Sequence, residues 1–572
     1  NKMAEEVWML QTKKADFKQI GARFRIDPVT ARIIRNRGIE GEAAIDRYLN
    51  GTLDDLYDPM LLKDMEHAVS ILCEAVDTGK KIRIVGDYDI DGVCSTYILL
   101  QAFERLGSDV DFEIPDRIKD GYGINESIIE QAHADGVEVI LTCDNGISAF
   151  HQVELAKKYG MTVVITDHHE VPLDGEKEKI PPADAVIDPK QADCPYPFPE
   201  ICGAVVAYKL VQVLYARRGV PQMEWLDLLE FAAIATVGDV MKLQDENRIL
   251  VKYGLKKMAQ TKNLGLRRLA EKNNLDLGAI TAYHIGFVIG PCLNAGGRLK
   301  TAKEALALLR AQSEEEAERL AEELKELNDT RKDMTEQGTE AAKLQVESWY
   351  QKDKVLVVFL PECHESLAGI IAGRLREYYQ KPAIVLTRGE EAVKGSGRSI
   401  DGYHMFKKLT EVSDLLLKFG GHPLAAGLSL EEKNIDEFRR RLNENAGLTE
   451  EDFKAKVWID VPMPVGYVTE RLVRELSCLE PFGQGNEKPL FAEKSLRIRA
   501  SRVLGRNRNV VKMTLEETDG HAIEALYFGD GTAFEEERAG RREIDVVYYP
   551  DINEYNGRKT LQAVIRRYKF RG

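Results

Sequence analysis

Three short apolar runs rich in β-branched residues lie in the first half of the chain and predict buried strands. They are residues 81–86 (KIRIVG), 137–143 (VEVILTC) and 161–166 (MTVVIT), and segments with helical spacing separate them. Parallel strands that are covered on both faces by helices show such continuous apolar runs rather than strict alternation. The pattern therefore predicts an α/β domain with a parallel sheet.

The pattern then changes twice. Residues 171–200 are rich in proline and charge, which predicts a loop or a mostly irregular segment, and helical spacing resumes near Ala204. From Ser313 to about Tyr350 the chain is dense in Glu, Ala, Leu and Lys, with no proline and one glycine. This composition predicts a long helix that connects two domains.

A second α/β pattern and a β-rich pattern complete the chain. Strand-like residues 355–360 and 383–386 flank a helix-like segment at 367–379. After Gly447, short strands alternate with Gly, Asn and Asp, which is typical of a small β-barrel such as an oligonucleotide-binding (OB) fold. We see no internal repeat.

A chain of 572 residues is too long for one hydrophobic core, so several domains are expected. We expect an α/β protein in which a long helix links a parallel-sheet domain to a second α/β domain, with an OB-like β-barrel after it. The expected bounds are 1–60 (an N-terminal helical segment), 61–312, 313–350 (the connecting helix), 351–447 and 448–572.

Composition narrows the class of protein. With 44% hydrophobic and 30% charged residues the chain should fold as an ordinary soluble protein, and no apolar stretch is long enough for a membrane span. We expect a cytoplasmic protein with no membrane association. The eight cysteines contain no CxxC pair, which favours reduced thiols over a disulfide frame or a zinc site. A net charge of -15 argues against nonspecific coating of nucleic acid but permits a nuclease with a local cationic track.

Each of the three predicted strands ends in acidic or histidine residues. The first is followed by GDYDIDG (86–92) with Asp87, Asp89 and Asp91, the second by Asp144, and the third by His168 and His169. Each cluster by itself is also consistent with a solvated turn. Because the carboxyl ends of parallel strands meet at one edge of a sheet, three such clusters point to one site. Carboxylates joined by imidazole are ligands for Mn²⁺ or Mg²⁺.

Four ordered motifs resemble those of the DHH phosphoesterase superfamily: VGDYDIDG (85–92), DNGIS (144–148), TDHHE (166–170) and TVGDVM (236–241). The resemblance implies that two Mn²⁺ or Mg²⁺ ions are held by Asp89, Asp91, Asp144, His168 and Asp239. It leaves Asp87 and Asp167 to orient these ligands. His169 is then free to contact the scissile phosphate or to protonate the leaving oxygen. Val85 stands where many relatives that cleave small nucleotides have histidine, which favours the RecJ branch.

Four further strings resemble substrate-binding segments of the superfamily. GSGRSIDGYH (395–404) and FGGHPLAAGLSL (419–430) are similar to the DHHA1 domain, and GPCLNAGGRLKTA (290–302) and CHESLAGIIAGRL (363–375) to the RecJ branch. The alternative for the glycine-rich strings is a pair of tight turns. The string GGRLKT lacks the spacing of an NTPase phosphate loop. The implied substrate-binding residues are Asn294, Arg298, His364, Ser396, Arg398, Ser399, Gly421 and His422.

The last region carries basic residues suited to a nucleic-acid strand. Five arginines bracket a strand-like segment (Arg497, Arg499, Arg502, Arg506, Arg508), and RRYKFR (566–571) adds aromatic rings. Solvated arginines on a β-domain are the alternative. The string LEPFGQGNEKPLF (479–491) resembles the RecJ junction with its OB domain and favours strand binding.

The resemblance implies a metal-dependent 5′-to-3′ exonuclease that releases mononucleotides from single-stranded DNA in recombination and repair. A single-strand binding protein and a helicase are possible partners. Two alternatives stay open: a phosphodiesterase for short oligonucleotides or cyclic dinucleotides, and an inactive scaffold. The scaffold hypothesis requires lost metal carboxylates, whereas all five implied ligands are present.

Overall fold

A computed structural model describes residues 4–572, which form two compact units. Among the described residues, the first unit comprises 4–7, 58–239 and 254–456, and the second comprises 8–57, 240–253 and 457–572. Within residues 4–572 no helix combines the length and apolar character that a membrane crossing requires.

The first unit contains the predicted parallel sheet. Its strands are β3 (Val110–Glu113), β2 (Ile82–Val85), β4 (Val139–Thr142), β5 (Thr162–Thr166) and β8 (Ala185–Ile187), in that spatial order, and every pairing is parallel. The three strands predicted from the apolar runs are confirmed as β2, β4 and β5. The strand order reverses between β2 and β4, and a crevice for ligands forms outside the carboxyl ends of strands at such a reversal.

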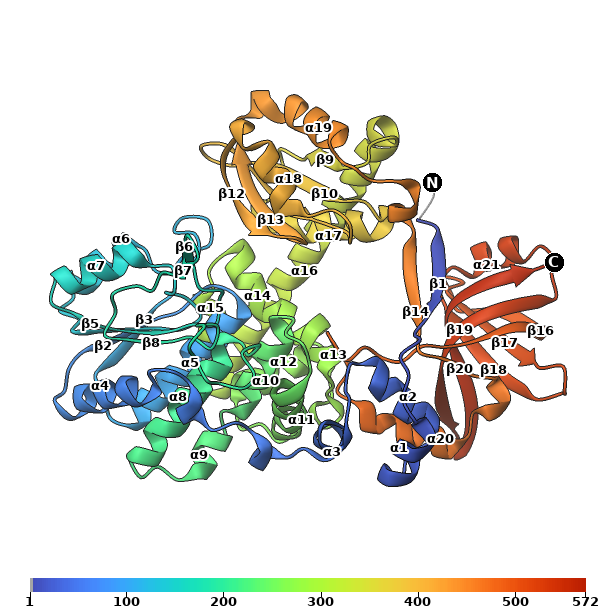
Figure 1. Ribbon diagram of the computed structural model, residues 1–572, viewed down its shortest axis with the longest axis horizontal. Helices are drawn as coiled ribbons and strands as arrows, with labels where there is room; N and C mark the ends of the chain where they lie inside the picture. The colour runs from blue at the N-terminus through green and yellow to red at the C-terminus, as the bar shows by residue number, and fades with distance from the viewer. Residues whose placement is uncertain (1–3) are drawn as a thin grey trace. The chain divides into compact units, whose positions relative to one another are not determined.

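Helices cover both faces of this sheet, as its buried strands require (Figure 1). Helices α6 (Glu126–Ala134) and α7 (Phe150–Lys158) cover one face and share a core with β2, β4 and β5. Helices α4 (Met65–Asp77), α5 (Ile90–Arg105) and α8 (Gly203–Arg217) lie on the other face. Helix α5 buries nearly every residue because it also packs against α8 and α10 (Leu229–Gly238).

The irregular segment expected over residues 171–200 is more ordered than its composition indicated. It contains a two-stranded hairpin, β6 (Leu173–Asp174) and β7 (Lys177–Glu178), and then β8, which extends the parallel sheet. Strand β8 is three fully buried residues between proline-rich segments, too short to stand out as an apolar run. Strand β3 also escaped prediction, since its sequence VDFE alternates polar and apolar residues and is only partly buried.

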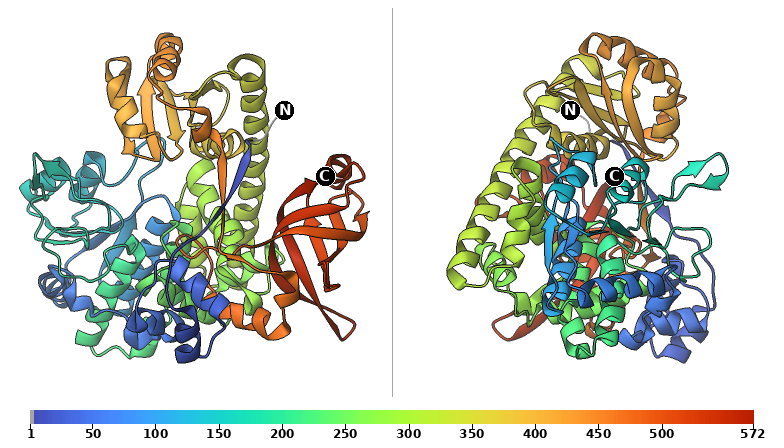
Figure 2. Two further views of the ribbon diagram at one scale, coloured as in Figure 1. Left: turned by 45° about the vertical axis from the view of Figure 1, so that its right-hand side comes forward. Right: turned by 90° about the vertical axis from the view of Figure 1, so that its left-hand side faces the viewer.

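A long helix connects this sheet region to a second sheet (Figure 2). Helix α16 (Glu314–Gln345) begins at the capping residue Ser313, packs along α12 (Leu264–Lys272) and α14 (Gly290–Leu299), and reaches α17 (Ala368–Tyr379). A π-helical turn, Val346–Tyr350, follows it directly.

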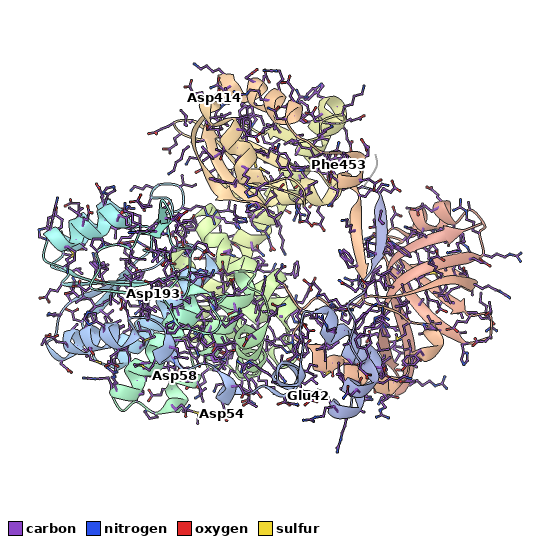
Figure 3. The ribbon with its side chains drawn as sticks, viewed as in Figure 1. Glu42, Asp54, Asp58, Asp193, Asp414 and Phe453 are labelled. Carbon is purple, nitrogen blue, oxygen red and sulfur yellow. The ribbon has the colours of Figure 1, made fainter. Side chains whose placement is uncertain are left out.

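The second sheet of the first unit has the order β12, β13, β11, β10, β9. Only β9 (Leu356–Phe359) and β10 (Ala383–Arg388) pair in parallel, and β11 (Val393–Arg398), β13 (Ala425–Leu430) and β12 (Leu416–His422) continue it in antiparallel fashion. Helices α18 (Met405–Glu411) and α19 (Ile435–Glu444) pack on its core. Figure 3 labels Asp414, which pairs with Arg441 of α19 at 2.7 Å.

The second unit is built on the β-barrel that the sequence predicted. Strands β15 (Val461–Pro462), β16 (Phe491–Leu504), β17 (Val510–Glu516), β18 (Ala522–Phe528), β20 (Arg558–Arg571) and β19 (Glu543–Tyr555) lie in that order, and β16 also pairs with β19 to close the sheet. Helices α20 (Glu470–Leu476) and α21 (Gly531–Arg538) contribute buried residues to the core of the barrel. Closure removes the exposed edges of the sheet.

The N-terminal segment, expected to be helical, opens with a strand. Strand β1 (Glu6–Leu10) pairs with β14 (Ala455–Ile459), and the helices α1 (Phe17–Phe24), α2 (Pro28–Asn36) and α3 (Glu42–Asn50) follow. Ile33 and Ile34 of α2 and Tyr48 of α3 belong to the same hydrophobic core as the barrel strands. These helices are therefore part of the barrel unit.

A buried ion pair joins α2 to the barrel within the second unit. Arg37 donates to both carboxylate oxygens of Asp460 at 2.7 and 3.0 Å, and the two side chains are 7% and 4% exposed. Asn36 also donates to Asp460. Loss of one member of such a pair leaves a buried charge without compensation.

We expect Asp460→Ala to lower the free energy of unfolding of the second unit by about 3–5 kcal/mol, because Arg37 remains buried and unpaired. Glu470→Ala, which removes the exposed pair with Arg474 in the same unit, should cost at most about 0.5 kcal/mol. Urea unfolding followed by circular dichroism compares the two variants. Equal losses would contradict the role given to Asp460.

Candidate functional site

The first acidic cluster lies where β2 ends and α5 begins. Asp89 is the N-cap of α5, and its Oδ1 accepts a hydrogen bond from the Gly92 backbone N–H at 2.8 Å. Gly92 is needed here, because a Cβ atom would lie 2.4 Å from the Asp87 carbonyl oxygen. The tight strand-to-helix turn thus gathers Asp87, Asp89 and Asp91 at the carboxyl end of the sheet.

Asp91 is held by the beginning of another helix. Its two carboxylate oxygens accept hydrogen bonds from the backbone N–H groups of Gly203 at 2.9 Å and Ala204 at 2.8 Å, in the first turn of α8. The positive end of a helix dipole favours a carboxylate in this position. These two hydrogen bonds fix the orientation of the fully buried Asp91 side chain.

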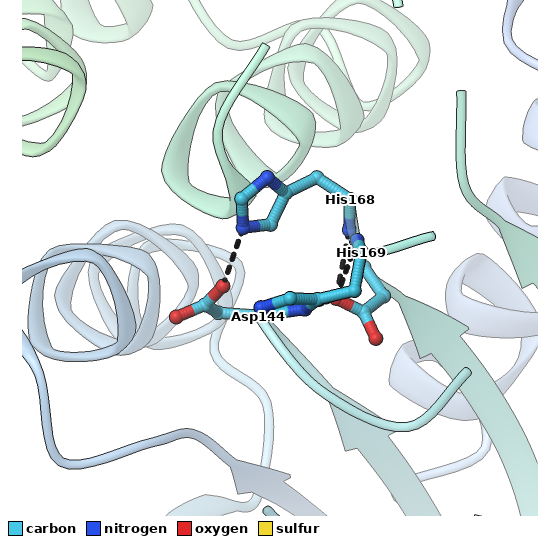
Figure 4. Close-up of side chains that lie close together, drawn as sticks. Asp144, His168 and His169 are labelled. Carbon is cyan, nitrogen blue, oxygen red and sulfur yellow. Dashed lines mark hydrogen bonds and ion pairs between the residues drawn. The ribbon is translucent and has the colours of Figure 1, made fainter. Parts of the chain in front are cut away.

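Asp144 follows β4 in a left-handed backbone conformation, with a φ of 59°. Its side chain is 1% exposed, and neither carboxylate oxygen accepts a hydrogen bond of regular geometry from residues 4–572. Asp144 Oδ1 does lie 2.9 Å from His168 Nε2, the contact drawn in Figure 4. One imidazole contact does not compensate a buried carboxylate, so a cation is required to balance its charge.

His168 completes the cluster. Its Nε2 atom lies 3.3 Å from Asp91 Oδ2, 2.9 Å from Asp144 Oδ1 and 3.8 Å from Asp239 Oδ2, and Asp239 caps the end of α10. Two sets of side chains, Asp91 with His168 and Asp239, and Asp87 with Asp89 and Asp144, each place their ligand atoms within 4.8 Å of one another. Oxygen and imidazole donors in two adjacent sets fit two divalent cations of the Mn²⁺ or Mg²⁺ type.

Burial and mutual repulsion raise the pKa values of four of the acids, Asp87, Asp89, Asp144 and Asp239. Burial, followed by repulsion from neighbouring carboxylates, raises the pKa of Asp87 and of Asp144 well above the usual range. Burial and the charges of Asp91 and Asp89 raise the pKa of Asp239 to about 9. The cluster is strongly destabilised as a set of anions until positive charge enters it.

His169 forms a separate dyad with Asp167. His169 Nδ1 lies 2.5 Å from Asp167 Oδ1, and the Asp167 carboxylate also accepts backbone N–H bonds from His168 and Ile147. Burial lowers the pKa of His169, but the Asp167 hydrogen bond and charge outweigh it and raise the pKa to about 9. His169 is 40% exposed, so a protonated imidazole is presented at the edge of the acidic cluster.

Two residues that hold the site together were not predicted. Tyr122 donates to the Asp144 backbone oxygen at 2.6 Å, and its hydroxyl lies 2.8 Å from His169 Nε2. The Asn145 side chain donates to three backbone oxygens, including those of Val85 and Gly86, and fastens the end of β4 to the end of β2. The Asn in the DNG string was the one signal for Asn145, and Tyr122 had none.

An uncompensated arginine cluster lies in the same unit. Burial, followed by repulsion from Arg117, Arg331 and Arg398, lowers the pKa of Arg298 to about 10. Within residues 4–572 none of these four guanidinium groups has a carboxylate partner, and Arg117 instead lies over the ring of Tyr88 at 4.5 Å. Arg298 donates to the Ser366 backbone oxygen at 2.8 Å, which links α14 to the second sheet region. Guanidinium groups that are buried without a carboxylate partner favour the binding of an anion.

The remaining predicted substrate-binding residues have different positions. Asn294 accepts from the Ile90 N–H at 2.9 Å and so holds the acidic turn, and Ser399 is buried and donates to the Tyr403 backbone oxygen at 2.6 Å. His364 caps the turn before α17. The other three lie on the second sheet: Ser396 on β11, and Gly421 and His422 at the exposed end of β12. No contact brings these three to the acidic cluster within the described residues.

Family models match three regions of the chain. The model of the DHH family N-terminal domain matches residues 81–236, the DHHA1 domain matches residues 352–447, and the RecJ OB domain matches residues 459–567. The three regions coincide with the parallel sheet, the second sheet and the barrel.

Relatives that match nearly the whole of this chain agree with the family models. The chain is 36% identical over 564 residues to the single-stranded-DNA-specific exonuclease RecJ of Bacillus subtilis, covering 98% of this chain and 70% of that protein. It is 34% identical to the protein of the same name from Escherichia coli, covering 94% and 95% of the two chains. A crystal structure of RecJ in complex with Mn²⁺ from Thermus thermophilus matches with a TM-score of 0.84 and 28% identity over 99% of this chain and 80% of that one.

Metal binding and pH should act together on stability. Between the ordinary aspartate pKa of 3.8 and the value of about 9 for Asp239, the folded state keeps a proton that the unfolded chain loses. The free energy of unfolding should therefore fall as pH rises through this window when EDTA is present. Mn²⁺, which replaces the proton, should raise the melting temperature most at the upper end of the window.

Thermal melts at several pH values test this coupling, with EDTA or Mn²⁺ present. Asp239→Asn removes one ionising group and should flatten the fall in EDTA and weaken the response to Mn²⁺. Asp174→Asn, an exposed control on β6, should behave like the unmodified protein. A melting temperature in EDTA that rises with pH across this window would overturn the assignment.

Proposed function

Since the chain belongs to the RecJ family of DHH proteins, we propose that it is an exonuclease for single-stranded DNA. In this proposal two Mn²⁺ or Mg²⁺ ions support hydrolysis of the phosphodiester bond, and mononucleotides are released in the 5′-to-3′ direction. Its place would be in recombination and repair. The observation that carries the proposal is the buried Asp144 carboxylate, which has the 2.9 Å contact with His168 Nε2 but no hydrogen bond of regular geometry among the described residues.

The metal ligands we propose are Asp89, Asp91, Asp144, His168 and Asp239. His168 belongs to one set of donors and Asp144 to the other, and their 2.9 Å contact joins the two sets. When bound, the ions would supply Lewis acidity, which activates water and neutralises the charge that develops on the phosphate. Asp87 and Asp167 would orient these groups: Asp87 from the same turn, and Asp167 through the N–H groups of His168 and His169.

His169 is proposed to act on the substrate rather than on a metal ion. Its pKa of about 9 keeps the imidazole protonated near neutral pH, and Asp167 fixes its Nδ1 side. The other ring nitrogen, Nε2, lies 2.8 Å from the Tyr122 hydroxyl, and it would exchange this partner for a phosphate oxygen or the leaving oxygen when substrate binds. A neutral imidazole would lack the second donor that this role needs.

The arginine cluster is proposed to receive the phosphate groups of the strand. Arg298 and Arg398, expected from the sequence, join Arg117 and Arg331 in a group of cations that have no carboxylate partners among the described residues. We extend this surface to His364, Ser396, Gly421 and His422 at the second sheet. Ser399 and Asn294 would support the site indirectly, through the hydrogen bonds that they make within the fold.

The barrel supports a polymeric substrate over a dinucleotide. Strand β16 carries Arg497, Arg499 and Arg502, and β20 ends in the basic aromatic string 566–571. A closed barrel with cations and rings suits the backbone and bases of a single strand. Activity on short oligonucleotides or cyclic dinucleotides is the second candidate function. It would give the basic and aromatic residues of the barrel no role in substrate binding.

We also propose the setting in which the protein works. The eight cysteines are free thiols, which fits a reducing, cytoplasmic compartment. A single-strand binding protein and a helicase remain proposed partners. We keep 61–312 as the catalytic region, 313–350 as its connection to the substrate-binding region 351–447, and 1–60 and 448–572 as the flanking parts.

Degradation of end-labelled oligonucleotides tests the activity. With Mn²⁺, the protein should release mononucleotides from the 5′ end of single-stranded DNA, and EDTA or Asp144→Ala should abolish the release. RNA of the same sequence measures whether the 2′-hydroxyl is tolerated. Cleavage of dinucleotides with intact long DNA would instead establish the small-substrate function, and cleavage of neither would refute both.

His169→Ala should separate chemistry from metal binding. We expect a roughly 100-fold or greater loss of the cleavage rate, the scale of general acid catalysis, while Mn²⁺ still raises the melting temperature. His151→Ala, an exposed histidine on α7, is the matched control and should keep full activity. A loss of the Mn²⁺ response in His169→Ala would make His169 a metal ligand instead.

A further inference from the structure

An exposed pair of stacked aromatic rings lies on the helix that supports the acidic turn. Tyr283 and Phe287 are 63% and 66% exposed, and their ring centroids lie 4.7 Å apart at an interplanar angle of 27°. Aromatic side chains of this size are normally buried, so two adjacent rings that face solvent together need an explanation.

These two residues belong to one continuous helix with a widened turn. Helix α13 (Ala282–His284) passes through the π-helical turn Ile285–Ile289 into α14 without a break in helical backbone angles. Single π-helical turns are rare and occur frequently at functional sites. Here Ile285 and Ile289 point into the core and are fully buried, while Tyr283 and Phe287 are turned outward.

The same helix holds the loop that carries the metal-ligand candidates. A Cβ atom on Gly290 would lie 3.5 Å from Ile90 Cδ1, and one on Gly297 would lie 2.6 Å from the Tyr88 carbonyl oxygen. Asn294 accepts from the Ile90 N–H at 2.9 Å. Ile90 stands between Asp89 and Asp91, so this helix packs directly against the acidic turn.

Helix geometry then fixes how far the rings lie from that contact. At about 1.5 Å of rise per residue, Phe287 is about 5 Å and Tyr283 about 10 Å along the axis from Gly290. A Cβ atom on Gly286, between the two rings, would lie 3.6 Å from Val237 of α10, two residues before Asp239. The aromatic pair thus lies within two helical turns of the contact between this helix and the acidic turn.

We propose that Tyr283 and Phe287 form a stacking platform for unpaired bases of the DNA strand next to the scissile bond. This inference rests on the proposed function and adds a base-binding site to it. Stacking on a ring face does not select among the four bases, which suits an enzyme that processes any sequence. Because the platform belongs to the helix that holds the acidic turn, a stacked base would place its phosphate in register with the cluster.

Binding measurements with and without bases test the platform. In an Asp144→Ala background, which keeps DNA intact, the double substitution Tyr283→Ala/Phe287→Ala should weaken binding of oligothymidylate about five- to hundredfold, the range for loss of base stacking. Its affinity for an abasic oligonucleotide of the same length should be unchanged, because no base is present to stack. The ring-preserving Tyr283→Phe/Phe287→Trp should restore binding of oligothymidylate.

A matched control is Trp349→Ala, which removes another exposed ring (72%) from the π-helical turn after α16 and should bind like the parent. Equal losses on oligothymidylate and abasic DNA, or no loss on either, would overturn the platform. Dissociation of a dimer by the double substitution, seen by size-exclusion chromatography, would overturn it in favour of an interface with a second copy.

A second readout separates failure of the platform from failure of the proposed function. With Asp144 intact, the double variant should hydrolyse an abasic oligonucleotide, a phosphodiester that has no ring to stack, with unchanged kcat in Mn²⁺. If the unmodified protein hydrolyses neither this oligonucleotide nor DNA that carries bases, the nuclease proposal fails, while the binding comparison still decides the stacking.

Discussion

Mutual repulsion among buried carboxylates at the reversal point of the parallel sheet governs the design of the catalytic region. Asp87, Asp91 and Asp144 are all at most 1% exposed, and such anions are too costly to bury without compensation. The fold supplies only part of it, through the N-terminus of α8 on Asp91 and the imidazole of His168. The remaining positive charge has to come from outside the chain. The site therefore favours the binding of cations.

The opposite imbalance exists among the arginines. Arg117, Arg298, Arg331 and Arg398 come from a loop, two helices and a strand, yet none is neutralised by a carboxylate of the described chain. The first unit therefore holds carboxylates without enough positive charge and arginines without carboxylate partners, and the two sets do not form ion pairs with each other. A phosphodiester bound together with metal ions would compensate both sets of charges. The phosphate would neutralise the arginines, and the metal ions would neutralise the aspartates.

The local sequence pattern was sufficient to predict that the residues at the ends of β2, β4 and β5 lie together. These three strands are visible as apolar runs, and parallel strands end at the same edge of a sheet. The pattern was insufficient for β3 and β8, whose short or mixed sequences carry no such run. Tyr122, Arg117 and Arg331 were likewise missed, because each is a single residue on a loop or helix, and only tertiary packing gives it neighbours. Ser399 was predicted to contact substrate, but its hydroxyl instead donates a hydrogen bond to the Tyr403 backbone oxygen within the fold.

The discontinuity of the second unit has a consequence for how the protein is made. Its core joins Ile33, Ile34 and Tyr48 to strands that follow residue 456, so the first helices are synthesised long before their partners exist. Until then their apolar faces are exposed while the whole first unit is translated and folds. Closing so long a loop is slow rather than thermodynamically prohibitive. The early helices therefore reach their final packing only after residues 457–572 have been synthesised.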